Sequence, residues 1–281
     1  MFETIKNAIF ASTNTKISML ILTKNTIKEI RSLEQRKARQ ELGVWLAEGN
    51  KMVGDLLKTA GLRFHCRKLV ATREWWIQNA EFEASADECY EVTRAEMDRV
   101  SLLHAPQDVL GVFALPSQKE ACPMADPEHL SILLDEVQDP GNVGTIIRTA
   151  DWFGIRDIFC APGTADCFSP KVVQATMSAL ARVRLHYFKS REELIQWLDR
   201  NDSMLFYGTF LEGENIYQKK LEAKGLLIMG NEGRGISDEV AKRVNQKLLI
   251  PAMTTEHVES LNVGIATAIC LSEINRKRYS E

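Results

Sequence analysis

The stretch LLDEVQDPGNVGTIIRTADWFG, residues 133–154, predicts a strand, a turn and a helix in that order. Residues 131–137 are apolar and have the length of a strand, and residues 138–142 are rich in turn formers. Asn142 is expected to cap a helix that begins near Val143. Such a unit is typical of a parallel sheet, in which a helix follows each strand.

This helix is predicted to have two different faces. Its buried stripe would consist of Val143, Ile146, Ile147 and Ala150. Its other stripe would carry Gly144, Thr145, Arg148 and Asp151. Because Gly144 and Thr145 are small, another molecule has room to approach the Arg148 guanidinium. The alternative is an exposed Arg148 that pairs with Asp151, an arrangement of little energetic consequence.

The composition limits the class of protein. A chain of 281 residues that is 45% hydrophobic can bury a full core, and its length favours two domains. The 35 basic and 38 acidic residues nearly cancel, so any surface for nucleic acid must be a local patch. No apolar run reaches the length of a membrane span, which predicts a soluble, unexported protein without membrane partners.

The six cysteines are scattered along the chain, and none lie two apart as metal or redox pairs do. Cys160 and Cys167, the closest pair, have no nearby histidine partners and are expected to be ordinary thiols. This usage favours a reducing cytoplasm and predicts no metal.

The N-terminal part reads as a compact α/β module. Residues 1–24 are expected to form an extension, because a clear pattern starts only near Met19. Strands are expected at residues 44–47, 68–71, 89–92 and 109–114, and helices at 25–41, 51–57 and from the cap Thr93 to Ser101. The first helix carries Lys28, Arg31, Arg36, Lys37 and Arg39. These cations form either a solvated helix face or a phosphate-contacting strip.

Residues 116–127 are the best candidate for a linker, because they are polar and contain three prolines. The pattern after them alternates between strands and helices. Strands are expected at residues 131–137, 157–160, 205–209, 225–229 and 247–251, and helices at 143–153, 170–180, 191–200, 237–243 and 260–278. This alternation predicts a mainly parallel sheet covered on both faces, with ligands beyond the carboxyl ends of its strands.

Two further strand ends in this part are unusual. LIMGNEGRG, residues 227–235, has three glycines in six residues and is followed by Ser237 as a helix cap. It matches neither GxGxxG nor GxxxxGK[ST], so a dinucleotide or triphosphate finds no specific support. The other follows Ile250, where Ser260 is expected to cap a helix with Asn262 in its first turn. Three such strand ends in one domain point to a shared site.

These three segments resemble, in order, the motifs of the SpoU (TrmH) family of RNA 2′-O-ribose methyltransferases, in the SPOUT superfamily. The motifs are DEVQDPGNVGTIIRTADWFGI, LIMGNEGRGIS and IP…ESLNVGIATAI. SPKVVQATMSA resembles the segment between the first two motifs. RKARQELGVWLAEGNKMV and APQDVLGVFALP are similar to the family's ribosomal-protein-like substrate-binding domain. The resemblance therefore runs from about residue 25 to the end.

The resemblance implies a fold and a division of the chain. The fold would be α/β, with a mainly parallel C-terminal sheet tied in a deep trefoil knot, a rare exception to unknotted topology. Residues 25–115 would form a smaller α/β domain that binds substrate RNA, and 128–281 the knotted methyltransferase domain. Family members act as dimers, and the site is completed across the dimer interface.

The resemblance also implies functional residues. The methyl donor S-adenosylmethionine would be lined by Gly230, Ile250 and Leu261, with Met253 and Ser260 nearby. The near-invariant functional positions of the family match Asn142, Arg148, Glu232, Ser260 and Asn262. No metal is required.

In the implied reaction a ribose 2′-hydroxyl attacks the sulfonium methyl group in line, so alignment is the main task of the protein. The family assigns deprotonation to the arginine that matches Arg148. Because arginine is a poor base, with a pKa above about 12, a role in holding the developing alkoxide and a phosphate is preferred here. Asn142 would support the arginine, and Glu232, Ser260 and Asn262 would order neighbouring loops.

Three departures from the family pattern concern the loops. Residues 251–259 form a loop about two residues longer than usual and without its glycine, Gly264 replaces a common serine, and Ser178 occupies a usual glycine position.

Ribosomal RNA is the favoured substrate and transfer RNA the close alternative. A catalytically silent RNA-binding protein and a generic nucleotide-binding enzyme are the other readings. The RNA and the nucleotide that is modified do not follow from the sequence.

Overall fold

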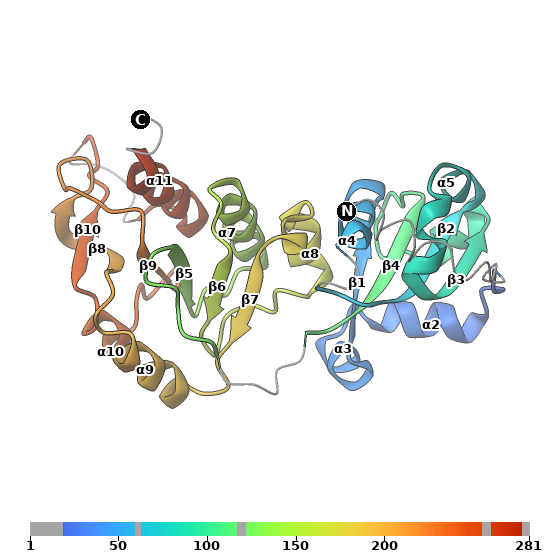
Figure 1. Ribbon diagram of the computed structural model, residues 1–281, viewed down its shortest axis with the longest axis horizontal. Helices are drawn as coiled ribbons and strands as arrows, with labels where there is room; N and C mark the ends of the chain where they lie inside the picture. Colours follow the sequence, from blue (N-terminus) through green and yellow to red (C-terminus); the bar gives the residue numbers. More distant parts are fainter. Residues whose placement is uncertain (1–18, 60–62, 117–121, 255–259, 277–281) are drawn as a thin grey trace, which may run out of the picture.

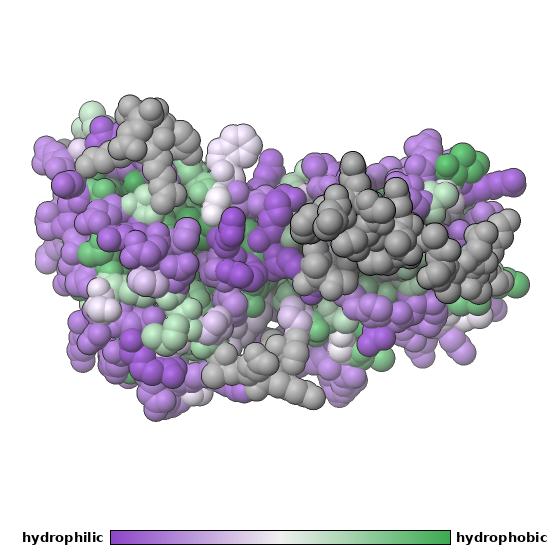
Figure 2. Space-filling view, viewed as in Figure 1, coloured by the Kyte–Doolittle hydropathy of each residue, from purple (hydrophilic) through white to green (hydrophobic). Residues whose placement is uncertain are grey.

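The computed structural model describes residues 19–59, 63–116, 122–254 and 260–276 (Figure 1). Two α/β units lie side by side along the longest axis of the molecule, one built on a four-stranded sheet and the other on a six-stranded sheet. Most of the surface visible in Figure 2 is hydrophilic, and its apolar side chains form small separate groups. No helix in the described residues is long and apolar enough to cross a membrane.

The first sheet has the strand order β1-β4-β2-β3. Its strands are β1 (Val44–Glu48), β2 (Cys66–Thr72), β3 (Ala86–Val92) and β4 (Val109–Ala114). The helices of this unit are α2 (Lys24–Ser32), α3 (Arg36–Leu42), α4 (Asn50–Lys58), α5 (Arg73–Gln78) and α6 (Arg94–Val100), with a 3₁₀ turn at Ala80–Ser85. Thr93 caps α6 as predicted, in a capping box with Glu96. The helix α5 was not predicted from the sequence.

The single helix predicted for residues 25–41 is wrong, because the chain turns between α2 and α3. Arg39 holds this turn, since its guanidinium donates to the carbonyl oxygens of Leu33 (2.6 Å) and Glu34 (2.8 Å). Arg31 donates to the carbonyl oxygen of Ser101 at 2.6 Å. Two of the five cations of this stretch are therefore structural. A solvated face or a phosphate-contacting strip would consist of the exposed Lys28, Arg36 and Lys37.

The second sheet has the order β10-β8-β9-β5-β6-β7, and all of its strand pairs are parallel, as predicted. Its strands are β5 (Leu130–Asp135), β6 (Asp157–Cys160), β7 (Arg184–Tyr187), β8 (Phe206–Asn215), β9 (Gly225–Gly230) and β10 (Gln246–Leu249). The strand β7 was not predicted from the sequence. The knot that the family resemblance implies stays a prediction.

Helices cover both faces of this sheet (Figure 1). One face carries α7 (Pro140–Trp152), α8 (Pro170–Thr176) and α11 (Val263–Asn275), and the other carries α9 (Arg191–Arg200) and α10 (Asp238–Ala241). The predicted helix 170–180 ends early, because Met177 (φ 50°) and Ser178 (φ 76°) adopt left-handed backbone conformations. Cys160 and Cys167 are buried in the core with their sulfur atoms 3.9 Å apart.

The two units share one interface, in which α8 contacts β1. The ring centroids of Trp45 and Phe168 lie 5.3 Å apart, and the buried Arg39 pairs with Asp166 at 2.6 Å. The Ser178 hydroxyl donates to Asp55 of α4 at 2.8 Å. Because apolar and charged contacts both cross the boundary, the units form a continuous core.

The segment expected to be the linker lies only partly within the described residues, which omit 117–121. Its second half packs on the six-stranded unit. Cys122 donates to the carbonyl oxygen of Tyr187 at 3.3 Å, and the Trp197 indole donates to the carbonyl oxygen of Pro123 at 2.7 Å. Residues 122–125 are therefore attached to the parallel sheet.

Candidate active site

The three unusual segments meet at one edge of the six-stranded sheet. β5 and β9 are neighbouring parallel strands, and their last residues Asp135 and Gly230 lie side by side in the register. The helix α7 follows β5, the glycine-rich loop follows β9, and α11 packs beside α7. The three segments that follow strand ends in the sequence therefore lie close together in the fold.

Glu232 of the glycine-rich loop binds the residues at the start of α7. Its carboxylate accepts hydrogen bonds from the backbone N–H groups of Gln138 (3.2 Å) and Asp139 (3.0 Å) and from the Asn142 side chain (3.0 Å). Partial burial works against the charged form, but these bonds outweigh it and lower the pKa of Glu232. The carboxylate joins the first two motifs.

Asn142 carries the connection on to the third motif. Its side-chain oxygen accepts a hydrogen bond from the Asn262 amide at 2.8 Å. The Asn262 oxygen in turn accepts from the backbone N–H groups of Gly264 (2.9 Å) and Ile265 (3.3 Å), which begin α11. Glu232, Asn142 and Asn262 thus form a continuous chain of hydrogen bonds through all three motifs, which we call the motif bridge.

Both caps predicted for these helices are wrong. Asp139, and not Asn142, is the N-cap of α7, and its carboxylate accepts from the Asn142 N–H at 2.8 Å. Pro140 then occupies the first helical turn, where its missing N–H costs nothing. Asn262, and not Ser260, caps α11, which begins at Val263. Ser260 is exposed and precedes the helix. Because Asn142 does not cap, its amide is free to join the motif bridge.

The buried stripe of α7 is as predicted, with Val143, Ile146, Ile147 and Ala150 each 0% exposed. The other stripe differs from the prediction. Gly144 is buried against α8, where an added Cβ would stand 2.4 Å from the Cβ of Ala175. The open space beside the helix therefore begins further along, at Thr145 and Arg148.

Arg148 is exposed and makes no hydrogen bond or ion pair with any residue in the described ranges. The alternative pairing with Asp151 is wrong, because Asp151 binds the guanidinium of Arg182 through contacts of 2.7 and 2.8 Å. Asn142 does not bind Arg148 either, since both ends of its amide serve the motif bridge. Arg148 is thus an unpaired cation about one and a half turns along α7 from the bridge.

The glycine-rich loop after β9 folds back on itself. The backbones of Asn231 and Gly235 exchange two hydrogen bonds of 2.9 Å, and Gly235 has a φ of 70°. An added Cβ on Gly230 would stand 2.2 Å from the carbonyl carbon of Gly235. The close backbone approach expected at Gly230 is therefore one between parts of the same loop.

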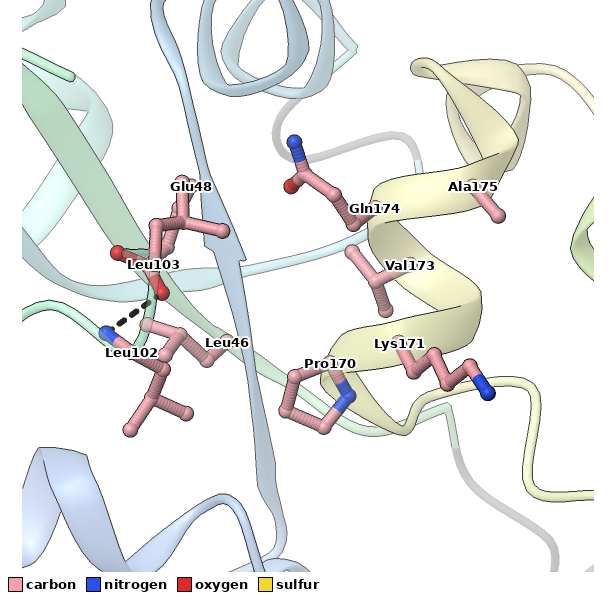
Figure 3. Close-up of a pocket in the computed structure, with 9 residues that line it drawn as sticks. All are labelled: Leu46, Glu48, Leu102, Leu103, Pro170, Lys171, Val173, Gln174 and Ala175. Carbon is pink, nitrogen blue, oxygen red and sulfur yellow. Dashed lines mark hydrogen bonds between the residues drawn. The ribbon is translucent and has the colours of Figure 1, made fainter. Parts of the chain in front are cut away.

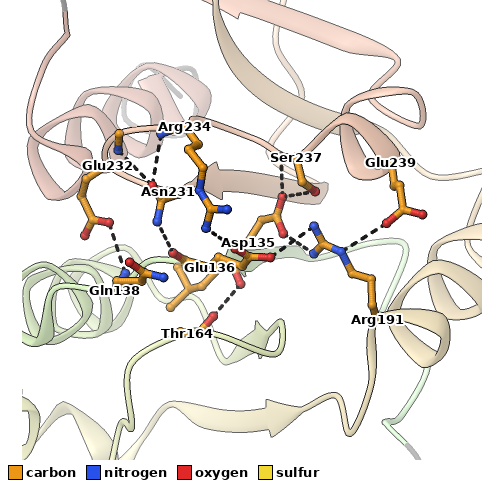
Figure 4. A network of polar contacts seen from close by, with 12 residues as sticks. Asp135, Glu136, Gln138, Thr164, Arg191, Asn231, Glu232, Arg234, Ser237 and Glu239 are labelled. Carbon is orange, nitrogen blue, oxygen red and sulfur yellow. Dashed lines mark hydrogen bonds and ion pairs between the residues drawn. The ribbon is translucent and has the colours of Figure 1, made fainter.

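A network of charges that the sequence analysis missed anchors this loop (Figure 4). Asp135, which is 1% exposed, accepts from Arg191 of α9 at 2.6 Å and from both the N–H (2.8 Å) and the hydroxyl (2.7 Å) of Ser237. Glu136 has a φ of 62° and accepts from Arg234 at 2.6 Å. Only the tertiary fold brings Arg191 to Asp135, so sequence spacing carried no signal for this contact.

The residues expected to line the donor site lie at the same edge of the sheet. Gly230 ends β9 and is buried, whereas Ile250 follows β10 and is half-buried. Met253 (96% exposed) and Leu261 (48% exposed) present apolar side chains to solvent, and Ser260 is exposed beside Leu261. The geometry predicted for the lengthened loop 251–259 falls largely on residues 255–259, outside the described ranges. No group of three histidine, cysteine, aspartate or glutamate residues in the described part is placed to hold a metal.

Comparisons with known proteins agree with this geometry. The SpoU rRNA Methylase family matches residues 129–272, and an MRM3-like substrate binding domain matches residues 24–111. The 23S rRNA (guanosine(2553)-2′-O)-methyltransferase RlmP of Bacillus subtilis is 29% identical over 86% of this chain and 93% of its own length.

Solved structures share the whole fold. A protein of the TrmH family from Porphyromonas gingivalis is 43% identical and superposes with a TM-score of 0.81 over 92% of this chain and 100% of its own. The AdoMet-bound rRNA methyltransferase from Sinorhizobium meliloti is 29% identical, with a TM-score of 0.78 over 92% of this chain and 98% of its own. The three motifs, their meeting at one sheet edge and these matches lead to one conclusion: the chain belongs to the SpoU rRNA Methylase family.

Proposed function

We propose that this protein transfers a methyl group from S-adenosylmethionine to a ribose 2′-hydroxyl in ribosomal RNA. The observation that carries the proposal is the unpaired Arg148 beside a fully connected motif bridge. An exposed cation that pairs with no residue in the described part of the chain is available to a phosphate or a developing alkoxide. The names of the Bacillus subtilis and Sinorhizobium meliloti relatives, both rRNA methyltransferases, support the reaction and the favoured class of RNA.

In this proposal Arg148 contacts the substrate, and the motif bridge positions α7. Arg148 holds the alkoxide that forms at the 2′-oxygen and an adjacent phosphate, with proton transfer aided by that phosphate. Glu232 and Asn142 fix the start of α7, and Asn262 fixes α11 against it. We assign Ser260 to the ordering of the neighbouring loop. Each of these residues supplies alignment, which is the main requirement of an in-line transfer.

The donor-side residues fit S-adenosylmethionine. Met253 and Leu261 offer apolar surface for the adenosine part, and Gly230 and Ile250 contribute backbone groups at the same edge. When bound, the donor supplies a methyl group on a sulfonium that leaves readily. The chain's own part is to hold the ribose hydroxyl and that methyl group in line.

We also propose that the protein acts as a homodimer through the exposed sides of α7 and α11. Trp152 is 83% exposed on α7, Ile265 is 52% exposed in the first turn of α11, and Leu261 (48% exposed) lies just before that helix. Large exposed apolar side chains on two adjacent helices favour a protein interface. Arg148 lies on the same exposed side of α7 as Trp152, which is consistent with a site completed across the interface.

We assign a different function to each of the two units. We propose that residues 25–115 bind substrate RNA, that 116–127 form the linker, that 128–281 form the knotted methyltransferase domain, and that 1–24 form an extension. The match of residues 24–111 to a substrate binding domain supports the first assignment. We also propose that the protein acts on ribosomal RNA in the cytoplasm.

The test combines a variant with a map of modified sites. Arg148→Ala should abolish methyl transfer to ribosomal RNA and leave S-adenosylmethionine binding, measured by calorimetry, largely intact. Arg156→Ala is the matched control, because Arg156 is also exposed and unpaired within the described residues. Total RNA from cells with and without the gene should differ in at least one 2′-O-methyl site. A folded Arg148→Ala protein with near-normal turnover would rule out the role of Arg148.

The same experiments decide between the alternatives. Loss of a site in transfer RNA alone would favour transfer RNA as the substrate. Failure of the wild-type protein to bind S-adenosylmethionine would favour a catalytically silent RNA-binding protein.

A further inference from the structure

A groove of about 430 Å³ lies between the two units (Figure 3). We call it the interdomain groove. It is lined by Leu46, Glu48, Leu102, Leu103, Pro170, Lys171, Val173, Gln174 and Ala175. One wall comes from β1 and the segment after α6, and the other comes from α8. Its volume lies within the range of about 300–1,000 Å³ that is typical of small-ligand sites. The groove is thus large enough for one nucleotide.

The first wall holds a buried carboxylate. Glu48, 6% exposed, accepts from the Leu102 N–H at 3.0 Å and from the Ser101 hydroxyl. Burial raises the pKa of Glu48 against the lowering effect of these bonds and of Arg31. Each carboxylate oxygen accepts one hydrogen bond from the described residues, so each retains a lone pair for a further N–H donor.

The second wall supplies apolar surface and an amide, and Lys171 lies at its edge with its side chain directed away from β1 (Figure 3). Pro170, Val173 and Gln174 point toward β1 in Figure 3. Gln174 and Lys171 make no hydrogen bond or ion pair within the described ranges. Apolar faces with a few polar groups at the edge suit a planar base, which single-stranded RNA presents when it is unstacked.

The groove also adjoins α7, the helix that carries Arg148. Ala175, one of its lining residues, packs against Gly144 of α7. Gly144 and Arg148 are four residues apart on α7, which places their side-chain positions about 5–6 Å apart on the same side. Lys171 lies one turn before Ala175 on α8 and so on the side that faces α7. The helix α8, which forms one wall of the groove, therefore lies between β1 of the first unit and the helix that carries Arg148.

We propose that the interdomain groove receives one unpaired nucleotide of the RNA substrate, close to the nucleotide that is methylated. Glu48 accepts a hydrogen bond from an amino group of its base, Gln174 contacts the base edge and Lys171 contacts its phosphate. Guanine is the best match, because its Watson–Crick edge presents two adjacent N–H donors, and uracil is the poorest, because its single N–H stands between two carbonyls. This inference rests on the proposed function and adds a substrate subsite to it.

The test fills the groove without touching the motif bridge. Gln174→Trp places a large side chain at a half-buried position of the groove, and Gln196→Trp, on the exposed side of α9, is the matched control. The acceptor is ribosomal RNA from cells that lack the gene. Gln174→Trp should lower kcat/KM for this RNA at least tenfold with unchanged S-adenosylmethionine affinity and melting temperature, whereas Gln196→Trp should match the wild type.

A second pair of variants tests the phosphate contact. Lys171→Gln should weaken binding of the same RNA several-fold and reduce the slope of log Kd against log salt concentration by about 1. Lys189→Gln removes an exposed lysine of the same unit away from the groove and should change neither quantity. Cross-linking of the wild-type protein to this RNA should place a guanosine, adenosine or cytidine in the groove.

The outcomes separate the two proposals. If the wild type methylates ribosomal RNA and Gln174→Trp does so with equal kcat/KM, the groove proposal is wrong and the proposed function stands. Loss of S-adenosylmethionine binding in Gln174→Trp would also overturn the groove proposal, because the groove would then act on the donor. If the wild type binds this RNA without methylating it, the groove proposal still stands when Lys171→Gln weakens binding and the cross-link lies in the groove. It is overturned when neither result is obtained. If it neither binds nor methylates the RNA, both proposals fall.

Discussion

Removal of the Asp135 carboxylate should destabilise the fold strongly. Its side chain is 0% exposed and accepts three hydrogen bonds, from Arg191 and from the N–H and hydroxyl of Ser237. Asp135→Ala leaves two donors of Ser237 unsatisfied, at about 1–3 kcal/mol each, and leaves Arg191 without its closest partner. Because Arg191 is only 24% exposed, the total should be about 3–5 kcal/mol, as for other broken buried ion pairs.

Asp135→Asn should cost less, about 1–3 kcal/mol, because the amide oxygen can still accept one of these bonds. The matched control is Asp199→Asn, since Asp199 also pairs with an arginine, Arg243, at 2.6 Å but on the surface, where ion pairs contribute little.

Urea unfolding gives the free energies, and thermal unfolding should show a drop of roughly 6–20 °C for Asp135→Ala. Hydrogen exchange should increase in residues 231–237, because Ser237 ties that loop to the strand end. An Asp135→Ala protein whose unfolding free energy stays within about 1 kcal/mol of the wild type would refute this account of the anchor.

Arg148→Lys keeps the charge but loses the planar fork, so methyl transfer should fall at least tenfold in kcat with unchanged donor affinity; equal kcat would mean that charge alone suffices. Ser178→Ala should lose about 1–2 kcal/mol with its bond to Asp55, whereas Ser178→Gly should stay near the wild type because glycine removes the left-handed strain of roughly 1–2 kcal/mol; equilibrium unfolding in which alanine proves the more stable would contradict this. The pKa of Asp157 is lowered from 3.8 to about 2, because bonds such as that from His186 outweigh the opposing effect of burial. Its stabilisation is therefore present above pH 3.8 and lost as the pH falls toward 2, so acid unfolding curves of the wild type and Asp157→Asn should converge in this window.

The parts of the fold that depend on local periodicity could be predicted from the sequence. The buried stripe of α7 follows from the 3.6-residue period, and the meeting of the motifs follows from parallel strands ending at one sheet edge. The missed strand Arg184–Tyr187 is a partly exposed edge strand of mixed polarity, so it lacks an apolar run. Strength of pattern, and not length, separates the strands that were found from the one that was missed.

The caps and charge partners of the site could not be assigned in the same way. Asp139 and Asn142 are both good caps three residues apart, and only the position of Pro140 in the first turn distinguishes them. Gly144 looked open because the position of α8 beside it depends on tertiary packing. Asp151 finds its partner Arg182 31 residues along the chain, beyond the reach of any helical spacing rule.

The contacts that join the two units restrict which ribose of the RNA substrate can reach Arg148. The buried pair of Arg39 with Asp166 and the packed rings of Trp45 and Phe168 hold the first unit at a set distance from Arg148. If the first unit binds the RNA substrate, as proposed above, that RNA can present to Arg148 only a ribose that lies at this distance. The choice of nucleotide then depends on length along the folded RNA as well as on base identity. Insertion of one base pair between the two contact points should therefore move the methyl group to a different residue or abolish its transfer.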